Sequence, residues 1–246
     1  MKQSVFQIKE NVNIAKNVFR MTLAGDTSDI TASGQFVNIK LDGFYLRRPI
    51  SVCDVREDGE LTLIYKVVGV GTEKMSEMTT GEELDILTGL GNGYDLTLSG
   101  ERPLLVGGGV GVPPMYMLAK ELIKEGKKVS VILGFNTKDE VFYEEEFRAL
   151  GASVEVTTVD GSYGTKGFVT QAMNKLDFTY FYTCGPEPML RAVCEATDKS
   201  GQLSFEERMG CGFGACMGCS CKTLTGYKRI CKDGPVMKKE EIIWQK

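Results

Sequence analysis

Residues 104–114 read LLVGGGVGVPP, and this stretch decides the fold of the second half of the chain. Three apolar residues suit a buried strand, the glycines permit a tight turn, and the two prolines suit the first turn of a helix expected over Met115 to Lys124. A strand, a glycine-rich turn and a helix in this order form the setting in which backbone amides approach a pyrophosphate. The run is neither the G-x-G-x-x-G fingerprint nor a P-loop, and a merely tight connection would also explain it. The candidate nucleotide contacts in this loop are Gly107, Gly108, Gly109 and Gly111.

The residues that follow alternate between apolar strands and helices. Strands are expected at 129–133, 153–157 and 179–183, and helices at 143–150, 169–174 and 188–197. This rhythm predicts a parallel sheet that is covered on both faces. Residues 183–189, TCGPEPM, again close a strand and open a helix, so both loops should face one crevice at the carboxyl ends of the strands. An ordinary turn with proline at the helix start is the alternative. The candidates in this second loop are Cys184, Gly185, Pro186 and Glu187.

The first part of the chain has a different pattern, in which short strands are separated by turn residues. Strands are expected at 5–9, 18–23, 34–41, 50–54 and 61–67, which is typical of an all-β sandwich or barrel. A diphosphate needs fixed cationic and amide donors, and Arg48, Ser51, Gly71 and Thr72 are suitable residue types. A solvated strand edge and a turn would explain them equally. With a boundary expected in SGERP, residues 99–103, we divide the chain into 1–99, 100–200 and 201–246.

Five of the eight cysteines fall between Cys211 and Cys231. The spacing C-x4-C-x2-C with a more distant fourth cysteine is typical of plant-type [2Fe–2S] sites, and the interspersed glycines let the backbone bend around a cluster. The x11 gap to the fourth cysteine is far shorter than in plant ferredoxins, so this part need not share their fold. The candidate ligands are Cys211, Cys216, Cys219 and Cys231. A structural zinc ion is the alternative, although zinc cysteines usually come as two close pairs. Cys221 could replace Cys219, but the x2 spacing favours Cys219.

Composition removes several classes of function. The chain has 246 residues and no histidine, which excludes a histidine-containing catalytic triad, a Rieske centre and a Cys/His zinc finger. With a net charge of -4, the chain lacks the excess of basic residues that is typical of nucleic-acid-binding proteins. No apolar run is long enough to span a membrane. The first residues, MKQSVFQ, mix charge and polarity too early for a signal peptide, so we expect a cytoplasmic protein. In such a protein, clustered cysteines favour metal binding over disulfides. Cys53, Cys184 and Cys194 are expected to be buried small apolar residues.

In this order, the segments resemble the ferredoxin-reductase-type flavoproteins, which join a flavin-binding β-barrel to a pyridine-nucleotide domain. Residues 48–51, RPIS, resemble that family's Arg-x-(Tyr/Phe)-Ser flavin motif, and Gly71-Thr72 resembles its phosphate-binding turn. Ile50 stands where many members have an aromatic ring. A cysteine cluster placed after the nucleotide domain is similar to one branch, the electron-transfer subunits of class 1B dihydroorotate dehydrogenases. The resemblance implies FAD held by Arg48, Pro49, Ile50, Ser51, Tyr65, Lys66, Gly71 and Thr72.

The resemblance also implies a route for electrons. NADH would deliver a hydride to FAD, and single electrons would pass through a [2Fe–2S] cluster to FMN in a separate catalytic subunit. In the physiological direction, electrons from the oxidation of dihydroorotate to orotate, a step of pyrimidine biosynthesis, would flow back to NAD. A heterotetramer with two copies of each subunit is implied, and no catalytic acid or base is required of this chain.

Two alternatives stay open at this point. The chain would share FAD and cluster with the small subunit of a ferredoxin:NAD(P) oxidoreductase or a sulfhydrogenase, which serves another partner. It could instead be a nucleotide-binding scaffold without enzymatic activity, whose tail is stapled by zinc. That reading predicts a colourless protein with one zinc ion.

Overall fold

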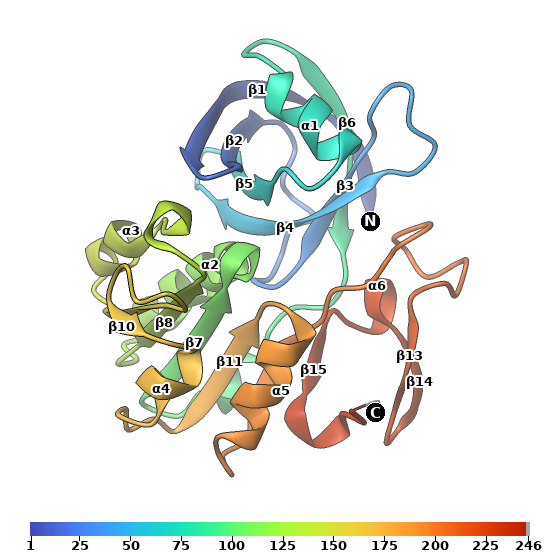
Figure 1. The fold of residues 1–246 in the computed structure, drawn as a ribbon. Helices are drawn as coiled ribbons and strands as arrows, with labels where there is room; N and C mark the ends of the chain where they lie inside the picture. Colours follow the sequence, from blue (N-terminus) through green and yellow to red (C-terminus); the bar gives the residue numbers. More distant parts are fainter. Residues whose placement is uncertain (245–246) are drawn as a thin grey trace.

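The first part of the chain closes into an antiparallel barrel in the computed structural model, which describes residues 1–244 (Figure 1). Its strands are β1 (Lys2–Ala15), β2 (Val18–Ala24), β3 (Phe36–Ile39), β4 (Arg48–Val55), β5 (Glu60–Lys66) and β6 (Glu83–Leu90). Their order is β1-β2-β5-β4-β3-β6, and β6 pairs with β1 to complete the ring. Alternate residues point inward, so Leu84 and Ile86 of β6 join the barrel core.

The barrel confirms the predicted β class and corrects its details. The sequence pattern missed β6, although ELDILTGL alternates between polar and apolar residues, and it gave β1 too short a range. It also missed α1 (Val70–Glu77), which lies between β5 and β6. That helix buries only Gly71 and Met75, so it has no apolar stripe that a periodicity could reveal.

The second part forms a seven-stranded sheet in the order β10-β9-β8-β7-β11-β12-β15. The strands are β7 (Pro103–Gly108), β8 (Ser130–Phe135), β9 (Ser153–Thr158), β10 (Thr165–Lys166), β11 (Tyr180–Cys184), β12 (Gly201–Ser204) and β15 (Val236–Lys238). Neighbouring strands run parallel except β12 and β15, which pair antiparallel. The helices are α2 (Pro113–Lys124), α3 (Glu144–Ala149), α4 (Val169–Met173) and α5 (Glu187–Glu195).

Both faces of this sheet are covered, as predicted. Leu105 of β7 belongs to a buried cluster with Met115 of α2 and Phe147 of α3. Its neighbour Leu104 faces the other way, into a cluster with Leu190 of α5. A central strand that is buried on both sides must be apolar throughout, which explains the uninterrupted LLV run.

The barrel and the sheet share one apolar seam. Cys53 of β4 and Ile64 of β5 lie on the outside of the barrel and belong to the same buried cluster as Met115 of α2. An ion pair between Lys120 Nζ and Asp54 Oδ1, 2.9 Å apart, crosses the seam beside them. A second pair joins Lys66 to Glu140 at 3.0 Å. These contacts fix the flavin-motif strand β4 relative to the nucleotide sheet.

Residues 205–235, which we call the cluster segment, leave the sheet after β12 and return to it at β15. They contain β13 (Ser220–Thr223), β14 (Gly226–Arg229) and α6 (Ile230–Asp233), beside the barrel and the sheet (Figure 1). We had expected a separate part from residue 201 onward, whereas β12 and β15 extend the nucleotide sheet. The short 3-10 turns are η1 (Leu96–Leu98), η2 (Gly109–Gly111), η3 (Lys138–Glu140) and η4 (Lys239–Glu241). None of the helices within residues 1–244 has the length and apolar character needed to cross a bilayer.

Candidate functional site

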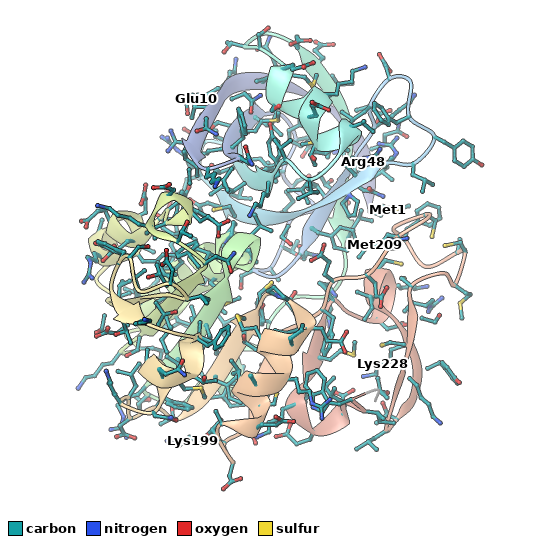
Figure 2. All side chains as sticks on the ribbon, viewed as in Figure 1. Met1, Glu10, Arg48, Lys199, Met209 and Lys228 are labelled. Carbon is teal, nitrogen blue, oxygen red and sulfur yellow. The ribbon has the colours of Figure 1, made fainter. Side chains whose placement is uncertain are left out.

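Arg48 and the start of α1 come together at the barrel edge, as Figure 2 shows for the labelled Arg48. A Cβ atom built on Gly71 would overlap Nε of Arg48, so the guanidinium lies directly against the first turn of the helix. Arg48 also donates to the Leu46 carbonyl at 2.6 Å and lies over the Phe44 ring. A fixed guanidinium beside the positive end of a helix is suited to an anionic diphosphate.

Thr72 holds the turn that precedes α1. Its Oγ1 accepts hydrogen bonds from the amides of Val68 (3.0 Å) and Gly69 (3.3 Å) and donates to the Gly69 carbonyl. The hydroxyl therefore stabilises the helix start. In this conformation all the hydrogen bonds of the Thr72 hydroxyl go to backbone groups of Val68 and Gly69.

The flavin-motif strand β4 presents two faces. Pro49 pairs with Asn38 and Ser51 pairs with Phe36, and residues directly opposite each other point to the same side of a sheet. Phe36 packs outside the barrel, against the cluster segment. Ile50 instead packs against the barrel core, on the opposite face of the strand. The outer face therefore offers Pro49 and Ser51.

Tyr65 and Lys66 lie away from this cradle. Tyr65 is 2% exposed, its hydroxyl donates to Asn11 Oδ1 at 2.9 Å, and its ring stacks on Phe19. Burial raises the pKa of Tyr65 to about 12, so the phenol is neutral. Lys66 is occupied by its ion pair with Glu140. The side chains of both residues are therefore engaged within the chain.

The two predicted nucleotide loops meet at the carboxyl ends of β7 and β11. These strands are neighbours, and Cys184 pairs with Gly107. A Cβ built on Gly111 would overlap the carbonyl oxygen of Cys184, and one on Gly185 would lie 3.3 Å from Cα of Gly108. The glycines therefore let two backbones touch, which is the close approach expected beside a dinucleotide.

The remaining residues of these loops differ in accessibility. Gly109 has φ of 53° and open space where a side chain would stand. Pro186 precedes α5 and Glu187 begins it, with the carboxylate exposed at the positive end of the helix. Burial raises the pKa of the Cys184 thiol to about 12, so it stays protonated at neutral pH.

The four predicted ligand cysteines form two pairs. The Cys211 sulfur accepts hydrogen bonds from the amides of Ala215 (3.2 Å) and Cys216 (3.4 Å), and the Cys219 sulfur accepts one from the Cys231 amide (3.4 Å). Cys219 and Cys231 are buried against Phe36 of the barrel, whereas Cys216 is exposed. One pair therefore faces inward and the other lies at the surface.

This donor set fits a two-iron cluster. Each iron of such a cluster takes two cysteine sulfurs, and amide donors around the sulfurs help to hold its negative charge. Burial opposes ionisation of Cys211, but amide hydrogen bonds outweigh it and lower the pKa of this thiol to about 6. Within residues 1–244, no three cysteine, aspartate or glutamate side chains are gathered around one point as a ready site for a single ion.

Cys221 lies close to the inner pair, at the edge of the apolar cluster that contains it. It lies in β13, opposite Lys228 of β14, and is partly buried. Burial raises the pKa of its thiol. The amide of Cys231 points at Cys219, which agrees with the spacing argument that prefers Cys219.

The sequence analysis did not single out Asn38, which contacts the cluster segment. Its Nδ2 donates to the carbonyl of Cys211 at 3.4 Å. The only local signal is one amide in the otherwise apolar strand FVNI. A contact between residues 173 positions apart leaves no pattern in either stretch.

Comparison with known proteins matches two family models to the chain. The iron–sulfur cluster binding domain of dihydroorotate dehydrogenase B matches residues 206–243, and an oxidoreductase NAD-binding domain matches residues 105–195. Proteins named dihydroorotate dehydrogenase B (NAD(+)), electron transfer subunit, match almost end to end. The one from Geobacillus sp. is 46% identical, covering 99% of each chain, and the one from Fusobacterium nucleatum is 49% identical, covering 96% of each.

The chain belongs to this family of electron transfer subunits. A solved structure of an NADH-dependent reduced ferredoxin–NADP oxidoreductase is also similar, with a TM-score of 0.88 and 32% identity over 97% of this chain and 90% of that chain. An Amycolatopsis cytochrome P450 reductase, 22% identical with a TM-score of 0.71 over 79% of this chain and 65% of its own, shares the fold. Family membership confirms the predicted family, fold and cofactor classes: FAD, an iron–sulfur cluster and NAD. The residues that contact each cofactor stay a prediction.

Proposed function

We propose that the chain carries electrons between NAD and the FMN of a dihydroorotate dehydrogenase catalytic subunit, through FAD and a [2Fe–2S] cluster. The arrangement of the cysteines supports this most directly. An inner pair packs on barrel strand β3, beside the flavin-motif strand β4, and an outer pair reaches the surface. A carrier needs its cofactors in line from an internal donor to an exposed exit, and this order meets that need.

The chain's own residues would hold and orient these groups. Arg48 and the first turn of α1, with Gly71 and Thr72, would bind the FAD diphosphate, while Pro49 and Ser51 would border the flavin ring. Gly107, Gly108, Gly109 and Gly111 would face NAD together with the loop from Cys184 to Glu187. When bound, FAD, NAD and the cluster supply the hydride and single-electron chemistry themselves. We therefore assign no catalytic acid or base to the chain.

The names of the relatives support a catalytic partner for this chain. An electron transfer subunit implies a catalytic partner, and we propose an FMN-containing partner in a heterotetramer of two copies of each chain. We propose a cytoplasmic location, with which the eight cysteines are consistent, since they form no disulfide within residues 1–244. Nucleic acid and membranes are not proposed as partners. The proposed division is a barrel at 1–99, a nucleotide part at 100–200 and a cluster part at 201–246, with β12 and β15 of the third lying in the sheet of the second.

The test is an anaerobic purification with the candidate catalytic subunit co-expressed. Flavin bands over a broad iron–sulfur shoulder, with about two iron and two sulfide per chain, are expected from the donor set. NADH should bleach the flavin bands. A colourless chain with one zinc ion and no flavin would instead support the zinc-stapled scaffold and remove the proposal.

The similarity to the ferredoxin–NADP oxidoreductase structure favours one second candidate, in which the exposed cysteine pair serves another protein partner. The same preparation separates the two. Reduction of NAD by dihydroorotate in the co-purified complex supports the dihydroorotate partner. A loaded chain that purifies alone and exchanges electrons with reduced ferredoxin supports the second candidate, as either an oxidoreductase or a sulfhydrogenase subunit.

A further inference from the structure

Asn38 of β3 is a buried amide at the junction of the barrel and the cluster segment. Its side chain is 1% exposed, and its Nδ2 donates to the Cys211 carbonyl at 3.4 Å. Its other amide atom, Oδ1, is buried and has no hydrogen-bond partner within the part of the chain that is described. A buried acceptor without a partner is uncommon in proteins, and the Nδ2 contact is the one side-chain hydrogen bond that Asn38 makes within residues 1–244.

The cluster segment is shaped around this amide. Gly212 follows the first ligand cysteine and has φ of 78°, a conformation that favours glycine. A Cβ built on it would overlap Nδ2 of Asn38, so the loop backbone runs directly against the side chain. The contact therefore depends on glycine at one position and on the amide at the other.

The same strand also touches the flavin motif. Asn38 pairs with Pro49, and Phe36 pairs with Ser51, so each pair points to one face. On that face Phe36 packs against the buried cysteines Cys219 and Cys231. Strand β3 thus lies between the residues proposed for the flavin and those proposed for the cluster.

The backbone of Asn38 is itself held in place. Arg47 donates from Nη1 to the Asn38 carbonyl at 3.3 Å and to the Asp85 carbonyl at 3.0 Å, and its Nη2 pairs with the Asp85 carboxylate at 2.9 Å. Arg47 therefore ties β3 to β6 at the level of the amide. A side chain on such a fixed support can set the position of the loop that it contacts.

We propose that Asn38 is a positioning residue that sets where the first cysteine pair stands relative to the flavin face, by holding the Cys211 backbone. This rests on the proposed function. Its removal should loosen the outer cluster ligands and alter electron flow between the flavin and the cluster. It should leave the hydride step alone, because the nucleotide loops at Gly107 and Cys184 belong to another part of the molecule.

The variants are chosen to separate the amide from the packing. Asn38→Leu keeps the branched shape in a somewhat larger side chain and loses the donor. Asn38→Asp keeps the shape and turns the donor into an acceptor facing a carbonyl, and Asn38→Ala removes both the donor and the packing. The matched control is Asn92→Ala. Asn92 also joins the barrel to the C-terminal region, through the Val236 carbonyl (2.8 Å) and amide (3.0 Å) and the Asp233 carbonyl (3.4 Å). Its side-chain hydrogen bonds therefore go to residues 233–236, and those of Asn38 to the loop at Cys211.

Each variant is purified as the complex and first checked for flavin content and for flavin reduction by NADH. The further readouts are the EPR spectrum of the reduced cluster, the rate at which a chelator removes the cluster, and the rate of electron transfer from the flavin to the cluster. Removing an outer partner of a metal ligand costs about 10–100-fold in metal affinity, so Asn38→Leu should lose its cluster at least about tenfold faster, with a changed EPR spectrum. The Asn92→Ala complex should match the unaltered complex in its rate of cluster loss and in its EPR spectrum.

Two results would overturn the proposal. One is an Asn38→Leu complex whose EPR spectrum, cluster retention and transfer rate are unchanged. The other is the same set of changes in Asn92→Ala, because it would show a general loosening of the junction. Should the unaltered chain hold zinc and no flavin, the proposed function itself fails, and that outcome is seen before any variant is made.

Discussion

The seven-stranded sheet and the cluster segment are stabilised in different ways. Strand β7 is fully buried between two apolar clusters, one against α2 and α3 and one against α4 and α5. Within the cluster segment the helix α6 has four residues, and large apolar side chains are exposed, namely Phe213, Met217, Leu224 and Tyr227. The sheet is held by apolar burial. The cluster segment has little core of its own, so its folding should depend on what its cysteines bind.

The largest expected effect is at the inner cysteine pair. Cys219→Ser should abolish the cluster, because a buried ligand whose sulfur receives the Cys231 amide would be replaced by a poor one. Cys221→Ser is the matched control and should keep it. The measurement is iron per chain with the visible spectrum, together with thermal unfolding of the remainder. Loss of iron from Cys221→Ser instead would reverse the ligand assignment.

That variant also tests the comparison between the two regions. When iron is absent, limited proteolysis should cut within residues 205–235 first, while fragments containing the barrel and the sheet persist. Hydrogen exchange should speed up over the same residues. If the nucleotide sheet opened together with the cluster segment, the two regions would form one cooperative unit, and the sheet would not be stabilised independently of the cluster segment.

A glycine substitution should have the next largest effect, within the well-packed region. A methyl group at Gly111 would overlap the Cys184 carbonyl, and overpacking of this kind costs roughly 1–3 kcal/mol, so Gly111→Ala should lower the unfolding midpoint. It should also weaken flavin bleaching by NADH. Gly109→Ala is the control, since its φ of 53° gives some strain but nothing stands within 4 Å. Equal effects from both would show that strain, and not the contact of the two loops, is responsible.

At the barrel edge the expected effect is on binding. Arg48→Gln removes the charge from the first turn of α1, and a charge-assisted hydrogen bond contributes about 1.5–3 kcal/mol, so flavin affinity should fall at least about tenfold. The measurement is flavin retained after dialysis at moderate salt. The matched control is Arg56→Gln, an arginine with exposed partners elsewhere on the barrel. Retention of flavin by Arg48→Gln would place the diphosphate elsewhere.

The sequence predicted the sheet better than the barrel for a physical reason. A parallel strand that is buried on both faces is an apolar run such as LLV. The glycines that follow it are required by the close approach of two backbones, so the local sequence is enough to predict the strand and its turn. Strand β6 carries only an alternation, and α1 only two buried residues, so both were missed. The cysteine spacing gave the ligand candidates because their loop is local. Asn38 could not be found, since its role comes from a contact across the fold.

The smallest effect is expected at the seam, where the Glu140 carboxylate accepts a hydrogen bond from Lys66 and so links the sheet to the barrel. Burial opposes its ionisation, but hydrogen bonds from Lys66 and Asn136 outweigh it and hold the pKa of Glu140 below its ordinary value. A lowered pKa in the folded state means that the stabilisation is complete above about pH 4.3, the ordinary glutamate value, and is lost as the pH falls through the folded value. Glu140→Gln should therefore cost at most about 1 kcal/mol of unfolding free energy at pH 7.

This cost should shrink toward zero in acid, where the carboxylate of the unaltered chain is protonated as well. Urea unfolding of both proteins at each pH gives the difference, and loss of the cluster in acid cancels because both chains suffer it. A difference that stays constant with pH would assign the effect to packing of η3 and not to the ion pair. The seam would then be held, like the sheet and unlike the cluster segment, mainly by its buried apolar residues around Cys53 and Met115, with the Lys120–Asp54 ion pair beside them.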